Sequence, residues 1–171
     1  MSEKIMLKII KRQFEISYQM LLEMVEACPE DLWTKINGGF PFWQQLYHTA
    51  YWIDFWLREA YDGSEFRSMI FDGSISFELN REVKTFKSYL TKEQLKEYLM
   101  KIHLKTERIF EKLNDEMLMT PIIPGKDDYT YSDVILEQVR HIMYHVGHCN
   151  SILRSKGLPA VEWIAHDDKN Q

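Results

Sequence analysis

Apolar residues recur every three or four positions between residues 4 and 27, with charged residues between them. This spacing follows the 3.6-residue turn of an α-helix, so the segment is predicted to be an amphipathic helix with one buried face. Pro29 disfavours helical geometry at Cys28, which predicts that the helix ends at "CPED". The apolar positions are Met6, Ile9, Ile10, Phe14, Tyr18, Leu21, Leu22 and Val25.

Three more segments show helical patterns. From Phe42 to about Tyr61, nearly every face is apolar, which is typical of a helix buried among others. Thr91 and Gln94 form a capping-box pattern before a third helix, and Ser132 can cap a fourth that runs to Lys156. Strand signals are weak, residues 120–132 are expected to be a loop, and residues 64–90 a long crossover. We therefore predict an all-α fold, a single domain over residues 1–171, and a four-helix bundle with a long crossover between helices two and three.

Charge and cysteine usage exclude several classes of function. The formal net charge is −5 and no block of Lys or Arg occurs, which argues against nucleic-acid and membrane partners. The N-terminal stretch lacks the continuous apolar region of a signal peptide, and no stretch is apolar enough to span a membrane. Because the two cysteines, Cys28 and Cys149, are far apart in the chain, we expect no disulfide framework and a cytoplasmic location.

The histidines are the most informative polar residues. Three of the six lie in "RHIMYHVGHCN", residues 140–150, and on a helix they form one narrow stripe. His141 and His148 would be about 10 Å apart along the axis, too far to share one ion easily. The pair His141 and His145 can share an ion, and the pair His145 and His148 remains possible. Taken alone, such a pair is common on helices that bind no metal.

A third ligand must come from elsewhere, and His48 is the best candidate. It lies midway along the most apolar predicted helix, where an unpartnered imidazole would be costly. Three neutral imidazoles would leave a position open for water or substrate, as in catalytic zinc sites. Cys149, four residues after His145, is a weaker candidate. No glutamate lies between His141 and His145, so the helix carries no HExxH motif.

The segment "HIMYHVGHCNSILRSKGLP", residues 141–159, resembles the closing motif of the DinB-like (damage-inducible) superfamily of metal-binding four-helix bundles. In that family the motif runs roughly HxxxHRGQI, followed by a leucine–arginine pair and a glycine. His141 and His145 fall on its two histidines, and His48 falls where the family places its third ligand. Val146 replaces the usual arginine and His148 the glutamine. We expect His148 and Tyr144 to lie near the metal without coordinating it.

The resemblance implies that His48, His141 and His145 bind a divalent transition metal, with zinc and nickel as the favoured ions. Family members include transferases that use low-molecular-weight thiols such as bacillithiol or mycothiol. The first hypothesis is therefore a metal-dependent thiol S-transferase, or a hydrolase, that acts on a small molecule and forms a homodimer. The alternative is a non-catalytic metal-binding stress-response protein or a homodimeric scaffold. No catalytic residue can be assigned from the sequence.

Overall fold

The computed structural model describes residues 4–58, 61, 75–79, 88–123 and 125–165. Within these ranges the chain is mostly helical, which confirms the expected all-α class. Four long helices are present among the described residues: α1 (Ile5–Ala27), α3 (Phe42–Trp56), α5 (Lys92–Lys112) and α7 (Tyr131–Ser155). Two short helices, α2 (Glu30–Trp33) and α6 (Asp115–Leu118), lie in the connections.

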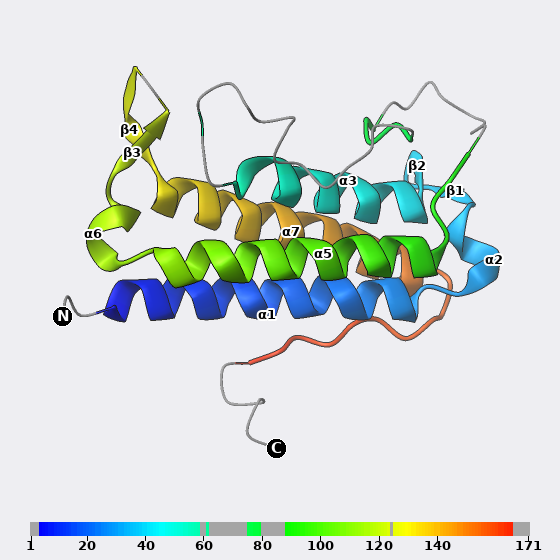
Figure 1. Cartoon of the computed structure of the whole chain (residues 1–171). Coiled ribbons are helices and arrows are strands. Elements are labelled where there is room, and N and C mark those ends of the chain that lie inside the picture. Colours follow the sequence, from blue (N-terminus) through cyan, green and yellow to red (C-terminus); the bar gives the residue numbers. More distant parts are fainter. Residues whose placement is uncertain (1–3, 59–60, 62–74, 80–87, 124, 166–171) are drawn as a thin grey trace.

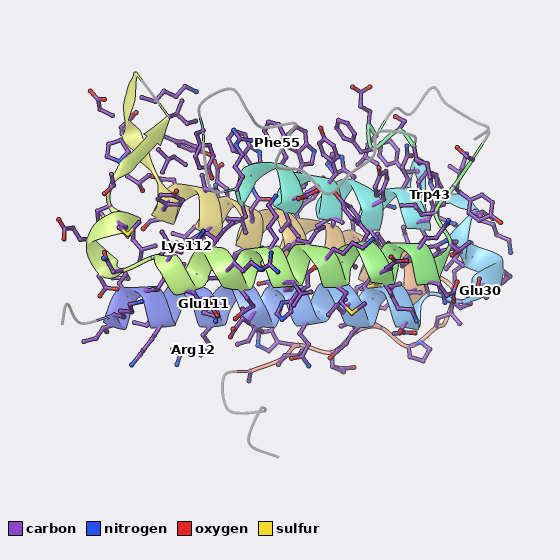
Figure 2. All side chains as sticks on the ribbon, in the orientation of Figure 1. Arg12, Glu30, Trp43, Phe55, Glu111 and Lys112 are labelled. Carbon is purple, nitrogen blue, oxygen red and sulfur yellow. The ribbon has the colours of Figure 1, made fainter. Side chains whose placement is uncertain are left out.

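The four long helices lie along one another (Figure 1). Helices α1 and α3 each pack against both α5 and α7. Helices α3 and α5 run in the same direction, opposite to α1 and α7 (Figure 1). Side chains from all four fill the space between them (Figure 2). Leu21, Leu46, Leu99 and Ile142, one from each long helix, are completely buried. The core therefore lies on the shared inner faces, as the apolar periodicity predicts.

Two small antiparallel hairpins are the described β-structure. One pairs β1 (Ile36–Asn37) with β2 (Phe40–Pro41), directly before α3. The other pairs β3 (Pro121–Ile123) with β4 (Lys126–Thr130), directly before α7. The second hairpin corrects the expectation of an irregular loop over residues 120–132. The hairpin also fixes where α7 begins, because β4 ends at Thr130 and the helix starts at Tyr131.

Several predicted helix ends are confirmed and two are corrected. Cys28 is extended, with ψ of 122°, and the Thr91–Gln94 capping box is present. Helix α7, however, is capped by Thr130 and Asp133 rather than by Ser132, whose hydroxyl donates to the carbonyl of Leu118 at 3.0 Å. Helix α3 ends at Trp56, not near residue 61.

The expected crossover between α3 and α5 falls mostly outside the described residues. Its described part includes residues 75–79, which lie against α3 through hydrogen bonds from Gln44, Tyr47 and His48. The chain after α7 is fixed by Asn150, whose side-chain amide donates to and accepts from the backbone of Val161, at 3.0 and 2.8 Å. None of the described helices has the length and hydropathy needed to cross a lipid bilayer.

Candidate metal centre

Three histidines from two helices meet between α3 and α7. His48 lies on α3, and His141 and His145 lie one turn apart on α7. Each contributes one ring nitrogen to a group in which all three nitrogens lie within 4.8 Å of one another. The ring centroids are 5.2 Å apart for His48 and His141, 5.1 Å for His48 and His145, and 4.8 Å for His141 and His145. The structure thus brings together the histidines that the sequence singled out.

The orientation of His48 is set by a backbone carbonyl. Its Nδ1 atom lies 3.0 Å from the carbonyl oxygen of Phe77. A carbonyl can only accept, so Nδ1 carries the proton and Nε2 keeps its lone pair for a ligand. Two nearby bonds hold the same segment: the Gln44 amide donates to the Glu78 carbonyl at 2.8 Å, and the Tyr47 hydroxyl donates to the Ile75 carbonyl at 3.1 Å. Hydrogen bonds of this kind fix the tautomer and ring angle of metal-binding histidines.

His145 has a buried nitrogen that no described residue of the chain pairs with. Its side chain is 4% exposed, and among the described residues its Nδ1 has no hydrogen-bond partner. An unpaired polar atom in a buried position is destabilising unless something else binds there. Imidazole nitrogens are preferred ligands of zinc and other divalent transition metals. The three side chains therefore fit a metal ion better than they fit an ordinary core.

All three imidazoles are held in the neutral form. Burial lowers the pKa of His48 below its usual value of 6.5. Burial, followed by repulsion from His48, lowers the pKa of His141 to about 4. Burial, followed by repulsion from neighbouring histidines, lowers the pKa of His145 to about 3. Near neutral pH no proton competes for the ring nitrogens, which is the state that a metal requires.

The two residues expected around the metal lie at different places. Tyr144 is 69% exposed, and its ring lies 5.2 Å from that of His145 in an edge-on arrangement. His148 lies outside the three-histidine group and is half-buried against the β1–β2 turn. A Cβ atom built on Gly38 in that turn would lie 2.4 Å from Nε2 of His148. His148 therefore packs against a glycine backbone, one turn beyond His145.

Two other potential ligands, Asp54 and Cys149, lie outside the three-histidine group. Asp54, on the same helix as His48, is completely buried and accepts hydrogen bonds from Lys105 at 2.6 Å and Tyr98 at 2.9 Å. Cys149 is also completely buried, and burial raises the pKa of its thiol well above the ordinary value. A buried thiol with a raised pKa is a poor metal ligand near neutral pH, because the thiolate is the binding form.

A cleft of about 630 Å³ opens beside His141. Its walls come from α3 and α7, and three of its lining side chains are aromatic. His141 and Tyr144 were predicted from the sequence, whereas the rest of the cleft was not, although Trp52 and Trp56 follow His48 at four-residue spacing on the same face of α3. The Phe77 carbonyl could not be found from sequence, because any residue type supplies it. The lining residues are Trp52, Trp56, Glu137, Gln138, Arg140, His141 and Tyr144.

Comparison with known proteins agrees with this geometry. The model of the DinB superfamily matches residues 13–149, a range that includes all three histidines of the centre. Neither the curated proteins nor the solved structures gave a match. The matched range covers most of the chain and includes α3 and most of α7, the helices that carry the site. The chain therefore belongs to the DinB superfamily.

Proposed function

We propose that the chain binds one divalent transition metal ion, zinc or nickel, through His48, His141 and His145. The fold that we propose around it is a four-helix bundle with a crossover between α3 and α5. The observation that carries the proposal is the meeting of three neutral imidazole nitrogens within 4.8 Å, one of them oriented by the Phe77 carbonyl. Neutral histidines are the usual ligands of catalytic zinc, and three of them leave a fourth position open.

We further propose that the protein is a metal-dependent enzyme that transfers a low-molecular-weight thiol to a small acceptor. A bound divalent ion lowers the pKa of a coordinated thiol and so supplies a thiolate nucleophile near neutral pH. The cleft beside His141 supports this proposal, because it gives a small molecule access to that side of the site. The Trp52 and Trp56 rings at the cleft would keep water away from the reacting groups.

The experiment uses protein loaded with cobalt(II), which absorbs visible light when bound by nitrogen and sulfur ligands. 2-Mercaptoethanol and cysteine are then titrated into the loaded protein. We expect an intense thiolate-to-cobalt charge-transfer band that saturates, together with the release of one proton per thiol. The matched control is 2-methoxyethanol, which has no thiol and should leave the spectrum unchanged.

Two results would contradict the proposal at different points. Protein that takes up no cobalt would contradict the metal centre itself. Protein that takes up cobalt but shows no sulfur band with any thiol would contradict the transferase, and would favour the non-catalytic metal-binding protein. The two outcomes are separated because metal content is measured before the thiol is added.

A further inference from the structure

Gln138 is a buried polar residue in the wall of the cleft beside His141. It lies on α7, one turn before His141, and its side chain is 3% exposed. Among the residues that the structure describes, its Oε1 atom has no hydrogen-bond partner. Leaving a buried acceptor unpaired is destabilising, so this atom would gain from a donor that enters the cleft. The last torsion of a glutamine side chain is soft, so the amide can turn its oxygen toward a group that enters the cleft.

The charges on the cleft wall balance one another. Nη2 of Arg140 lies 3.5 Å from Oε1 of Glu137, and the Arg140 side chain is 75% exposed. The other oxygen of Glu137 accepts a hydrogen bond from the Tyr129 hydroxyl at 2.5 Å. One positive and one negative group thus face each other at the cleft, so the cleft has no net charge with which to select an ion. Specificity must come from its aromatic walls and from Gln138.

The aromatic wall is built from α3. Trp52 and Trp56 are four residues apart, on one face of the helix, and both line the cleft with His141. Both rings are half-buried, so each keeps part of its surface available to a ligand. Trp56 is further supported by Tyr129, whose ring centroid is 6.1 Å away. Flat ligands stack favourably on such rings.

We propose that this cleft binds an uncharged, flat heteroaromatic molecule and that Gln138 is the residue that selects it. The flat body lies against Trp52 and Trp56. One lone-pair nitrogen of the ligand ring points toward the metal site at His141, and an N–H group of the same ring donates to Oε1 of Gln138. The contact of the lone pair with the metal rests on the proposed function. The contacts with Trp52, Trp56 and Gln138 need no metal. The inference names the substrate class that the proposed enzyme would accept: small azoles and related rings that carry both a lone-pair nitrogen and a ring N–H group.

The test compares benzimidazole with 1-methylbenzimidazole. Both are flat and both offer one nitrogen lone pair, but only benzimidazole has an N–H group. Dissociation constants are measured by ligand-observed NMR with zinc-loaded protein and with metal-free protein. For the native chain we expect benzimidazole to bind about tenfold more tightly than its methylated form, because only benzimidazole pairs with the buried acceptor.

The decisive variant is Gln138→Leu, which keeps the size of the side chain and removes the acceptor. We expect its preference for benzimidazole to fall below about twofold, since neither ligand can then form the bond. Gln138→Met serves the same purpose if the leucine variant does not fold, as judged by circular dichroism. The matched control is Gln13→Leu, which makes the same change at an exposed position of α1 away from the cleft and should keep the native preference. Trp56→Leu should weaken both ligands to a similar extent, by about two- to tenfold.

Each possible result either supports or overturns the proposed role of Gln138. An unchanged preference in Gln138→Leu, or no binding of either ligand in either metal state, would overturn it. A preference that depends on Gln138 in the metal-free protein would support the cleft even if the chain takes up no zinc, which is the result that contradicts the proposed function. A preference that depends on Gln138 only in zinc-loaded protein would support both.

Discussion

Nδ1 of His48 lies 3.0 Å from the carbonyl oxygen of Phe77, 29 residues further along the chain. This contact ties the segment after α3 to the candidate metal centre. The segment is held in turn by its side chain, because the Phe77 ring stacks on Tyr51 with centroids 3.4 Å apart and planes inclined by 5°. The segment therefore orients a histidine through a backbone atom that side-chain stacking keeps in place.

Phe77→Ala should weaken metal binding without removing a ligand. Loss of the stacked ring frees the carbonyl that orients His48, and lost contacts of this kind cost about 10–100-fold in metal affinity. The measurement is a competition titration against a chromophoric zinc chelator. Tyr89→Ala is the control, because Tyr89 is also aromatic but is 50% exposed. Equal zinc affinity in Phe77→Ala and the native chain would show that the stacked ring is not needed to hold the carbonyl against His48.

The metal-free protein should lose stability as the pH falls below about 6.5. The pKa of His141 is lowered to about 4 and that of His145 to about 3, so the folded chain resists protonation that the unfolded chain accepts near pH 6.5. The unfolded state thus binds more protons in this window, and the free energy of unfolding decreases as pH falls. Stability is retained in full above the unfolded pKa and is lost progressively toward pH 4 and pH 3.

The check is urea denaturation of the native chain and of His145→Phe between pH 7.5 and pH 4. Carboxylates also destabilise the fold in acid, so the difference between the two proteins is the informative quantity. We expect the phenylalanine variant to lose less stability than the native chain across this range. Parallel pH curves for the two proteins would show that His145 is not held neutral by the fold.

Gly38→Ala should be more destabilising than Gly125→Ala. Both glycines have positive φ, 62° and 80°, which costs an alanine about 1–2 kcal/mol at either position. At Gly38 the new Cβ atom would also meet a neighbour, at 2.4 Å from Nε2 of His148, whereas no described residue beyond the chain neighbours lies within 4 Å of a Cβ atom at Gly125. The contact should add about 1–3 kcal/mol, in the range found for overpacking.

Thermal or urea unfolding of both alanine variants measures the difference, and His148→Ala supplies the second half of the test. With the imidazole removed, the two glycine substitutions should have nearly equal effects on the free energy of unfolding. If Gly38→Ala remains the more destabilising in that background, the close approach of His148 is not the cause.

Lys105→Met should destabilise the fold but leave metal binding intact. Lys105 donates to the completely buried carboxylate of Asp54 at 2.6 Å, and removing one partner of a buried ion pair costs about 3–5 kcal/mol. The free energy of unfolding and the zinc content of the folded variant are measured together. Loss of zinc from folded Lys105→Met would mean that Asp54 takes part in the metal centre.

The helices could be predicted because their apolar residues recur at helical spacing, and the grouping of the three histidines because of that spacing together with the family resemblance. His141 and His145 are four residues apart, and His48 lies in an apolar helix where a lone imidazole needs a partner. The start of α7 was misplaced because Thr130 and Ser132 are both good caps, and the β3–β4 hairpin decides between them. The Phe77 carbonyl and the glycine contact of His148 depend on how distant segments pack, which no local pattern reveals.

The metal content of histidine variants tests the central claim most directly. The native chain and the variants His48→Ala, His141→Ala, His145→Ala, His148→Ala and His103→Ala are loaded with zinc, freed of excess, and analysed by elemental mass spectrometry. We predict one equivalent of zinc per native chain and its loss in the first three variants. His148→Ala should bind zinc no more than about 10–100-fold more weakly, and His103→Ala, on the exposed face of α5, should match the native chain. Full retention of zinc in His48→Ala would contradict the three-histidine centre.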